Sequence, residues 1–145
     1  MTRVDLRRGS SAPFQSMMAL EKAVEETFAA SGLDPLLGEL VKIRASQING
    51  CAHCLRMHVR DATTLGETPD RPAVVAAWRE TQYFTPAEQA ALALTERVTY
   101  ASEQGRHDAD TSALTDEQVA AVTWAAIAIN AWNRIAVESG TPVGP

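Results

Sequence analysis

Residues 39–58 of this chain read ELVKIRASQINGCAHCLRMH, and this stretch decides the fold. A segment with helical spacing ends at Asn49-Gly50, a turn-forming pair, and a second helical segment follows at once. So short a turn predicts that the two helices fold back on each other as an antiparallel pair. The second helix opens with Cys51 and Cys54 and reaches His58 one turn later. We therefore expect an all-α protein in which such a pair carries a Cys-x-x-Cys motif.

The spacing within this motif indicates chemistry. Cys51, Cys54 and His58 lie three and four residues apart, which places them along one face of a helix. Two cysteines so spaced at a helix start can close a disulfide, and the free N–H groups of the first turn favour a thiolate. These N–H groups favour Cys51 as the reactive thiolate, whereas the neighbouring imidazole base favours Cys54. The pattern predicts a redox-active dithiol.

Glu39 is expected to lie beside His58. At a rise of about 1.5 Å per residue, Glu39 lies roughly 13 Å before the end of the first helix, and His58 lies roughly 10 Å into the second. In an antiparallel pair the two side chains are then level, so the carboxylate can orient the imidazole or exchange a proton with it through water. The alternative is a solvated glutamate that pairs with Lys42.

The rest of the chain predicts one helical domain. Its length of 145 residues suits a single core, so residues 1–145 are interpreted as one domain with peripheral tails at 1–12 and 141–145. Proline at first-turn positions, capping boxes and terminal glycines delimit a bundle of about six helices. We expect these helices at about residues 14–30, 35–47, 51–65, 71–80, 86–102 and 116–139.

Composition narrows the possible partners and location. The formal net charge is −5 and no Lys/Arg block occurs, which disfavours binding to nucleic acid or to an anionic membrane. Neither a secretory signal nor a membrane-spanning apolar run is recognisable, so a cytoplasmic location is expected. Two closely spaced cysteines in that reducing compartment are more plausibly catalytic or metal-binding than structural.

Several helix positions carry further expectations. Arg44 falls within an apolar arc, so it should be buried with an acidic partner or lie at an interface. Trp78 and Trp124 are interpreted as core anchors. A second group, Asn130, Trp132, Asn133 and Arg134, could border the active-site cavity or an interface, but is interpreted as structural because buried amides and arginine heads mostly satisfy helix ends and hydrogen-bond networks. Residues 120–129 are apolar almost all round, which predicts burial inside the domain or across a contact between subunits.

With its Glu, Cys-x-x-Cys and His at these separations, the chain resembles the alkylhydroperoxidase D-like branch of the carboxymuconolactone decarboxylase-like proteins. Residues 40–54 look like the core segment of that family, and further resemblance extends over most of the chain outside the termini. The resemblance implies an all-helical subunit of a trimer or hexamer that reduces hydroperoxides with thiols, using no metal, flavin or other cofactor. The reductant would be a dithiol, in the best-understood branch one carried by a lipoylated protein.

The resemblance also implies roles for individual residues. Cys54 would attack the peroxide, Cys51 would resolve the sulfenic acid to a disulfide, and His58 with Glu39 would relay the proton. We therefore favour Cys54 over Cys51 as the nucleophile. His53 also matches the motif and is kept as a candidate catalytic residue, although a histidine there can simply face solvent or cap a carbonyl.

Three other functions remain open from the sequence. Lactone decarboxylation by proton transfer is typical of family members that lack the cysteine pair, which this chain has. A redox-sensing subunit could use the same disulfide without turnover. A zinc site is disfavoured because His53 points away from the face that Cys51, Cys54 and His58 share, so a fourth ligand is missing.

Overall fold

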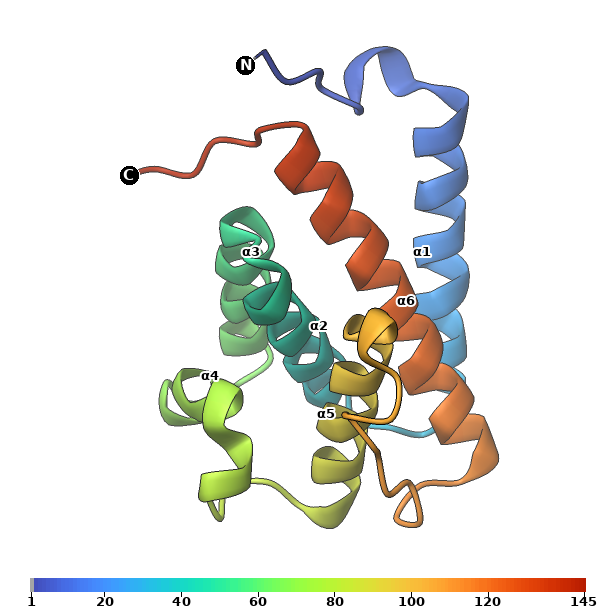
Figure 1. Ribbon diagram of the computed structural model, residues 1–145, viewed down its shortest axis with the longest axis vertical. Coiled ribbons are helices and arrows are strands. Elements are labelled where there is room, and N and C mark those ends of the chain that lie inside the picture. The colour runs from blue at the N-terminus through green and yellow to red at the C-terminus, as the bar shows by residue number, and fades with distance from the viewer. Residues whose placement is uncertain (1) are drawn as a thin grey trace.

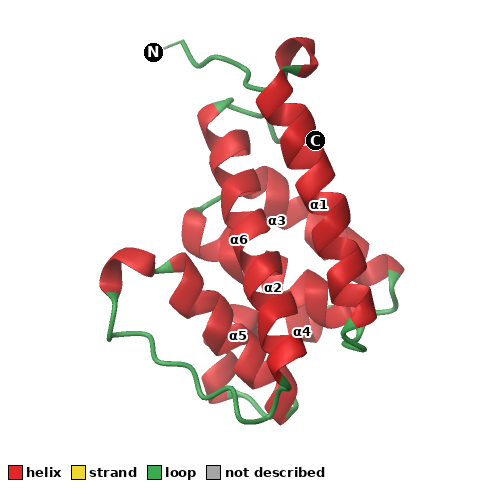
Figure 2. Cartoon of the chain, turned by 90° about the vertical axis from the view of Figure 1, so that its right-hand side faces the viewer, coloured by secondary structure: helices red, strands yellow, loops and turns green. Residues whose placement is uncertain are grey.

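The computed structural model describes residues 2–145, and all regular secondary structure within them is helical (Figures 1 and 2). The expected all-α bundle of about six helices is therefore confirmed. The α-helices are α1 (Ala12–Ala30), α2 (Pro35–Asn49), α3 (Ala52–Thr64), α4 (Asp70–Val74), α5 (Pro86–Thr99) and α6 (Asp116–Glu138). Three short 3-10 helices accompany them: η1 (Arg8–Ser10), η2 (Val75–Glu80) and η3 (Ala101–Glu103).

Helix α2 is the centre of the core. It packs against α3, α5 and α6, whereas α1 packs mainly along α6 (Figure 1). Leu40, Val41 and Ile43 of α2 are fully buried. Burial of three branched side chains stabilises the fold by roughly 5 kcal/mol or more relative to their exposure. Because Glu39 lies on the same helix, the central helix of the core carries one of the predicted site residues.

Local signals set the ends of the helices that flank the site. The Asp34 carboxylate accepts a hydrogen bond from the N–H of Leu36 and caps α2, which begins with Pro35. Gly50 ends α2 in the left-handed conformation with φ 66°, which favours glycine. The turn places Cys51 at the N-cap of α3, so α2 and α3 form the expected helix pair.

The segment 71–80 differs from the single helix that the sequence predicts. Helix α4 ends at Val74, and the chain continues as the 3-10 helix η2, with Ala77 outside the helical region at φ −120° and ψ 31°. This break buries Trp78, whose indole N–H donates to Glu96 at 3.0 Å. Tertiary packing therefore overrides the local helical pattern, while the role of Trp78 as a core anchor is confirmed.

Glu96 is the acidic partner of Arg44 that the sequence left unnamed. Its buried carboxylate accepts hydrogen bonds from Arg44 Nε at 2.8 Å and from Arg79 at 2.6 Å, in addition to Trp78. Burial raises the pKa of Glu96, but the hydrogen bonds from Arg79, Arg44 and Trp78 lower it by more than burial raises it. The pKa therefore lies below its ordinary value. The three donors tie α2 and η2 to α5.

The expectation that Trp124 is a core anchor is wrong. Its side chain is 48% exposed, and that of Ile127, one turn further along α6, is 40% exposed. Helix α6 turns its other faces to α2, α5 and α1, so this stripe faces outward within the described chain. The apolar character of residues 120–129 is thus only partly explained by the domain core.

Residues near both ends of the described chain are hydrogen-bonded to the helices or to their ends. Arg3 donates to the carbonyl of Val137 at 2.8 Å, and the N–H of Leu6 donates to Ser139 Oγ at 3.1 Å. Near the other end, Arg56 donates to the carbonyl of Gly144 at 2.9 Å. Within residues 2–145, no helix combines the length and the apolar character that crossing a membrane requires.

Candidate active site

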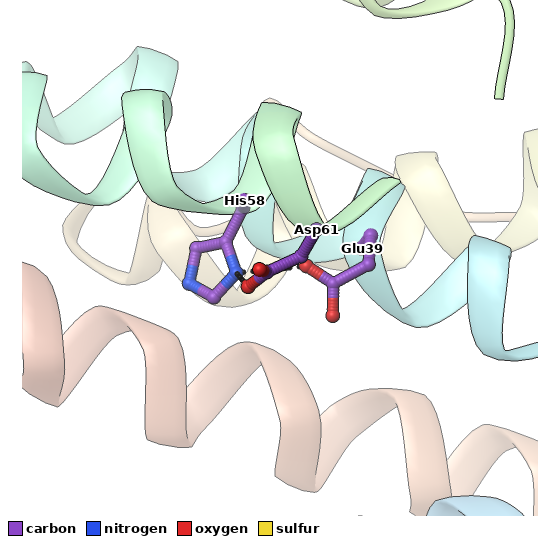
Figure 3. Close-up of side chains that lie close together, drawn as sticks. All are labelled: Glu39, His58 and Asp61. Carbon is purple, nitrogen blue, oxygen red and sulfur yellow. Dashed lines mark hydrogen bonds and ion pairs between the residues drawn. The ribbon is translucent and has the colours of Figure 1, made fainter. Parts of the chain in front are cut away.

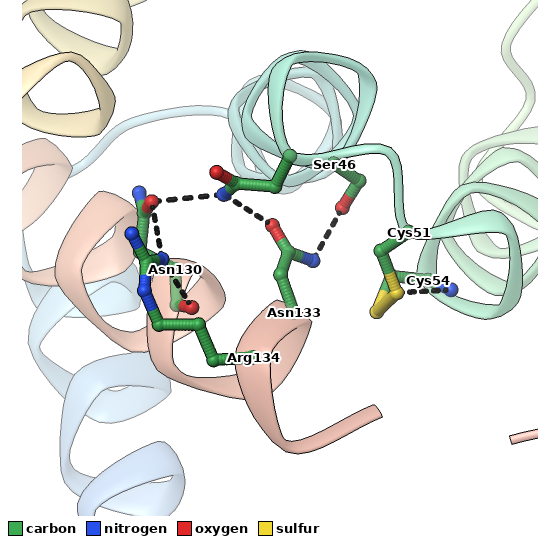
Figure 4. Close-up of a disulfide and its surroundings, with 7 residues drawn as sticks. Ser46, Cys51, Cys54, Asn130, Asn133 and Arg134 are labelled. Carbon is green, nitrogen blue, oxygen red and sulfur yellow. Dashed lines mark hydrogen bonds between the residues drawn. A yellow bond between two sulfur atoms is a disulfide. The ribbon is translucent and has the colours of Figure 1, made fainter. Parts of the chain in front are cut away.

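A disulfide joins Cys51 and Cys54 at the start of α3 (Figure 4). The two Cα atoms lie 5.4 Å apart, and both residues are buried. Cys51 is the N-cap residue of α3, and its Sγ accepts a hydrogen bond from the backbone N–H of Cys54 at 3.3 Å. This N–H is one of the free donors of the first turn, so it favours negative charge on the Cys51 sulfur after reduction.

A network of amide side chains fixes the turn that carries Cys51. The Nδ2 group of Asn49 donates to Oδ1 of Asn130 and to Oδ1 of Asn133, each at 2.9 Å. Asn133, which is fully buried, donates in turn to Ser46 Oγ at 2.9 Å (Figure 4). The backbone N–H of Cys51 donates to the Ser46 carbonyl at 3.0 Å. The network holds the end of α2 against α6, so Asn130 and Asn133 have the structural role that the sequence predicts.

Glu39 and His58 meet across the helix pair (Figure 3). Glu39 Oε2 lies 2.8 Å from His58 Nδ1, and both residues are buried. An ionised carboxylate can only accept, so the proton of a neutral imidazole lies on Nδ1 and Nε2 is left as a free base. In Figure 3 this second nitrogen points away from both carboxylates. The structure thus brings together the two residues that helix counting places level.

Lys42 provides the charge that balances Glu39. Its ammonium lies 3.2 Å from Glu39 Oε1 and 3.8 Å from Glu21 Oε1, and Glu21 Oε2 accepts from the indole N–H of Trp132 at 2.8 Å. Burial raises the pKa of Glu39, but the hydrogen bond from His58 and the charge of Lys42 outweigh it, so the pKa lies below its ordinary value. The Glu39–Lys42 ion pair, given above as the alternative to a Glu39–His58 contact, therefore forms as well. Its glutamate is buried and not solvated.

Asp61 adds a third group next to this pair. Its carboxylate lies 3.7 Å from His58 Nδ1 and is about half exposed. Glu39, His58 and Asp61 offer one ligand atom each within 4.8 Å, the kind of cluster that can hold a metal ion. The Lys42 ammonium, 3.2 Å from Glu39, repels a cation there. Cys51 and Cys54 are bonded to each other, which leaves their sulfurs unable to serve as zinc thiolates in this state.

A cavity of about 410 Å³ opens onto Cys54 and the Glu39–His58 pair. It lies between helices α1, α2, α3 and α6, and most of its wall is apolar. Phe14 of α1 packs edge-on against Trp132 of α6, with ring centroids 5.8 Å apart, and closes one side. The remaining lining residues are Arg7, Met18, Glu21, Glu25, Lys42, His53, Met57, Asp61, Ile129, Ile135 and Ala136. Cys51 does not line this cavity.

His53 lies at the edge of the same cavity but takes no part in the Glu39–His58 hydrogen bond. Burial lowers its pKa below the ordinary value, and the positive charges of Arg7 and Arg56 and the nearby His58 add to the effect. These effects favour the neutral form of His53. A catalytic role for His53 stays a prediction.

Most of the cavity wall comes from residues that the motif does not predict. Glu21 and Phe14 come from α1, far from the motif in sequence, and no local pattern connects them to it. Trp132, which the sequence indicates as structural, lines the cavity, and its indole N–H donates to Glu21. Asp61 carried a usable signal, because it lies three residues after His58 on one helix.

Comparison with known proteins assigns the chain to a family. The model of the carboxymuconolactone decarboxylase family matches residues 14–97, a span that includes Glu39, both cysteines and both histidines of the motif. The chain belongs to the carboxymuconolactone decarboxylase family. The resemblance to its alkylhydroperoxidase D-like members, seen from the motif alone, is confirmed.

Two relatives of this family member cover nearly its whole length. An uncharacterised protein of Bacillus subtilis (strain 168), YdfG, is 36% identical over 128 residues, which are 86% of this chain and 84% of the relative. A solved structure from Agrobacterium tumefaciens shares 36% identity and a TM-score of 0.85, covering 99% of this chain and 100% of that one. That protein is described as of unknown function and suggested to be the antioxidant defence protein AhpD.

Proposed function

We propose that this family member is a thiol-dependent peroxidase that reduces hydroperoxides through a Cys51–Cys54 dithiol–disulfide cycle. The observation that carries the proposal is the shared cavity, because Cys54 and the Glu39–His58 pair line the same space. A base, a thiol and room for a substrate thus occur together. The suggested antioxidant role of the Agrobacterium tumefaciens relative points the same way.

In the first half of the cycle, Cys54 is the nucleophile. His58 Nε2 takes the proton of the Cys54 thiol, while Glu39 holds Nδ1–H and stabilises the imidazolium. The thiolate attacks the terminal oxygen of ROOH, the O–O bond breaks, and the alkoxide leaves as ROH with the proton from His58. Cys54 is thereby oxidised to a sulfenic acid.

In the second half, Cys51 resolves this intermediate. The Cys51 sulfur attacks the Cys54 sulfenic sulfur, hydroxide leaves as water with the proton of the Cys51 thiol, and the Cys51–Cys54 disulfide forms. A dithiol then reduces the disulfide, and a lipoylated protein is one candidate. No metal or other cofactor enters the cycle, because sulfur carries both electrons. His53 is kept as an auxiliary polar residue at the cavity edge.

Hydroperoxide consumption tests the proposal. Purified protein is mixed with cumene hydroperoxide and a dithiol reductant, and the rate is compared between the unaltered chain and Cys54→Ser, Cys51→Ser, His58→Ala and His53→Ala variants. We expect background rates for both cysteine variants, a loss on the order of 100-fold for His58→Ala, and a smaller loss for His53→Ala. Mass analysis should show a sulfenic acid in Cys51→Ser and none in Cys54→Ser.

Two other outcomes would replace the peroxidase. Background consumption by every protein would contradict it, and the Glu39–His58 pair, which needs no sulfur, would then favour a proton-transfer enzyme of the decarboxylase type. A disulfide that forms with hydroperoxide but never turns over would indicate a redox-sensing subunit. Activity that survives in Cys54→Ser would reassign the nucleophile.

We further propose that the protein is a cytoplasmic homo-oligomer, a trimer or hexamer, with no nucleic-acid or membrane partner. The exposed stripe of Trp124 and Ile127 on α6 is the candidate contact, because large apolar side chains at helical spacing favour burial against a partner. Sedimentation analysis should give the mass of three or six chains. Trp124→Glu should lower that mass, and a monomeric unaltered chain would contradict the assembly.

A further inference from the structure

The two cysteines of the disulfide line different cavities. Cys54 lines the large apolar cavity with Glu39 and His58, whereas Cys51 lines a second cavity of about 240 Å³. Neither Glu39 nor His58 lines the second cavity. Its wall comes from the start of α3, the end of α6 and the N-terminal segment: Arg3, Gly50, Cys51, Ala52, His53, Ala136, Val137, Gly140 and Thr141. His53 and Ala136 line both cavities and mark the border between them.

The small cavity has polar groups suited to a ligand. Thr141, part of its wall, has a buried hydroxyl that makes no hydrogen bond to any of residues 2–145. A buried hydroxyl without a partner is unfavourable, and a polar group of a bound molecule would satisfy it. Arg3 adds a guanidinium at the wall, where one of its N–H groups donates to the Val137 carbonyl.

We infer that the small cavity is the entry site for the thiol reductant, and that the reductant attacks Cys51 rather than Cys54. The inference rests on the proposed dithiol–disulfide cycle. Hydroperoxide and reductant would then reach the same disulfide pair from two separate cavities. Thiol–disulfide exchange depends on which sulfur is accessible and on how well the other sulfur leaves as a thiolate. The N–H of Cys54 favours a Cys51 thiolate and the proposed base His58 favours a Cys54 thiolate, so the inference rests on the separate cavities and not on the leaving group.

The exchange balances as two attacks. A thiolate of the reductant attacks Cys51 Sγ, the Cys51–Cys54 bond breaks, and Cys54 leaves as a thiolate while a mixed disulfide forms on Cys51. The second thiol of the reductant then attacks the reductant's sulfur in the mixed disulfide. The reductant closes its own disulfide, and Cys51 leaves as a thiolate. The two protons lost by the reductant end on the two cysteines or on His58. Attack at Cys51 leaves Cys54 free in the large cavity, which the proposed base His58 also lines, ready for the next hydroperoxide.

Trapping of the mixed disulfide tests the inference on the unaltered chain. The oxidised protein, prepared once with cumene hydroperoxide and once with diamide, is mixed with 2-mercaptoethanol, quenched with acid at successive times and alkylated with N-ethylmaleimide. Trypsin releases residues 45–56 with both cysteines, and fragmentation shows which sulfur carries each label. We expect 2-mercaptoethanol on Cys51 and N-ethylmaleimide on Cys54, in about tenfold excess over the reverse.

The outcomes separate the inference from the proposed function. An excess of adduct on Cys54, or equal labelling of the two, overturns the inference even where hydroperoxide forms the disulfide normally. A disulfide that diamide forms but hydroperoxide does not overturns the peroxidase. In that case the diamide sample still decides which sulfur a thiol attacks.

Paired variants give an independent kinetic test. Ala52 is exposed and lines only the small cavity, so Ala52→Phe narrows that entry, whereas Met57→Phe alters only the large one. We expect Ala52→Phe to slow disulfide reduction by dithiothreitol about tenfold while oxidation by cumene hydroperoxide changes less than about twofold. Met57→Phe should leave the reduction rate unchanged. The inference is overturned if Ala52→Phe leaves the reduction rate unchanged, or if it slows both half-reactions equally. If that variant does not fold, the trapping experiment alone decides.

Discussion

Glu39 and His58 face each other at 2.8 Å although 19 residues separate them in the sequence. The contact depends on the turn at Gly50, which sets α3 antiparallel to α2. Glu39 uses its second oxygen for Lys42, so the carboxylate is held from both sides. A buried anion with two partners of this kind is suited to fixing one tautomer of the histidine.

Removal of the Glu39 charge should slow the first half-reaction. In Glu39→Gln the amide cannot stabilise a His58 imidazolium, so we expect oxidation of the dithiol by cumene hydroperoxide to slow on the order of 100-fold. Stopped-flow tryptophan fluorescence can follow the step in a single turnover. Glu25→Gln is the matched control, because Glu25 lines the same cavity and should change the rate less than about threefold. Equal rates for the two variants would remove Glu39 from the relay.

Lys42 should set the acid limb of the pH–rate profile. Its positive charge lowers the pKa of Glu39, so in Lys42→Met that pKa should rise and Glu39 should become protonated at a higher pH. Activity that requires ionised Glu39 is then lost at a higher pH, and the acid limb of kcat/KM should move up by about one unit. Lys22→Met, a change at the exposed Lys22 of α1, should leave the profile in place. An unshifted limb would mean that Lys42 does not control Glu39.

Glu96 should make folding stability sensitive to acid. Its pKa is lower in the folded state than the unfolded value of about 4.3, so its contribution is complete above that pH and is lost as the pH falls through the folded-state pKa. Glu96→Gln should therefore flatten the fall in the free energy of unfolding below about pH 4. At pH 7 it should cost on the order of 2 kcal/mol, less than a fully buried pair because Arg79 is half exposed. Urea denaturation at several pH values, with the exposed Glu80→Gln as the control, measures both effects.

Asn133 should matter for stability more than for chemistry. In Asn133→Ala the Asn49 amide and the Ser46 hydroxyl each lose a buried partner, which should cost about 2 kcal/mol of unfolding free energy. The loss should be the same for oxidised and reduced protein if the network only fixes the turn. Arg134→Ala, at the exposed neighbouring position, should cost less than about 0.5 kcal/mol. A loss confined to one redox state would instead couple the network to the disulfide.

The sequence predicted what depends on local periodicity. Helical spacing placed Cys51, Cys54 and His58 on one face, and axial counting placed Glu39 level with His58, because both rest on the fixed rise of an α-helix. The same reasoning gave α1, α2, α3 and α6 to within two residues at each end. These are the parts of the fold in which neighbours in sequence are also neighbours in space.

The sequence could not predict what depends on tertiary packing. Helix α4 and η2 break because Trp78 reaches Glu96 of α5, a contact 18 residues away in sequence. Trp124 has the apolar character of a core residue, and only the arrangement of α6 against its neighbours shows that it faces outward. The cavity wall contributed by Phe14 and Glu21 depends in the same way on where α1 lies.

Helix α2 carries Glu39 and is also the helix that most of the domain packs against. Its amide hydrogens should therefore exchange with solvent only when the whole domain unfolds, whereas those of α4 and η2 should exchange through local opening. Glu39 thus lies on the helix that we expect to unfold last. Fluctuations in the surrounding segments can admit or release small molecules without unseating that carboxylate.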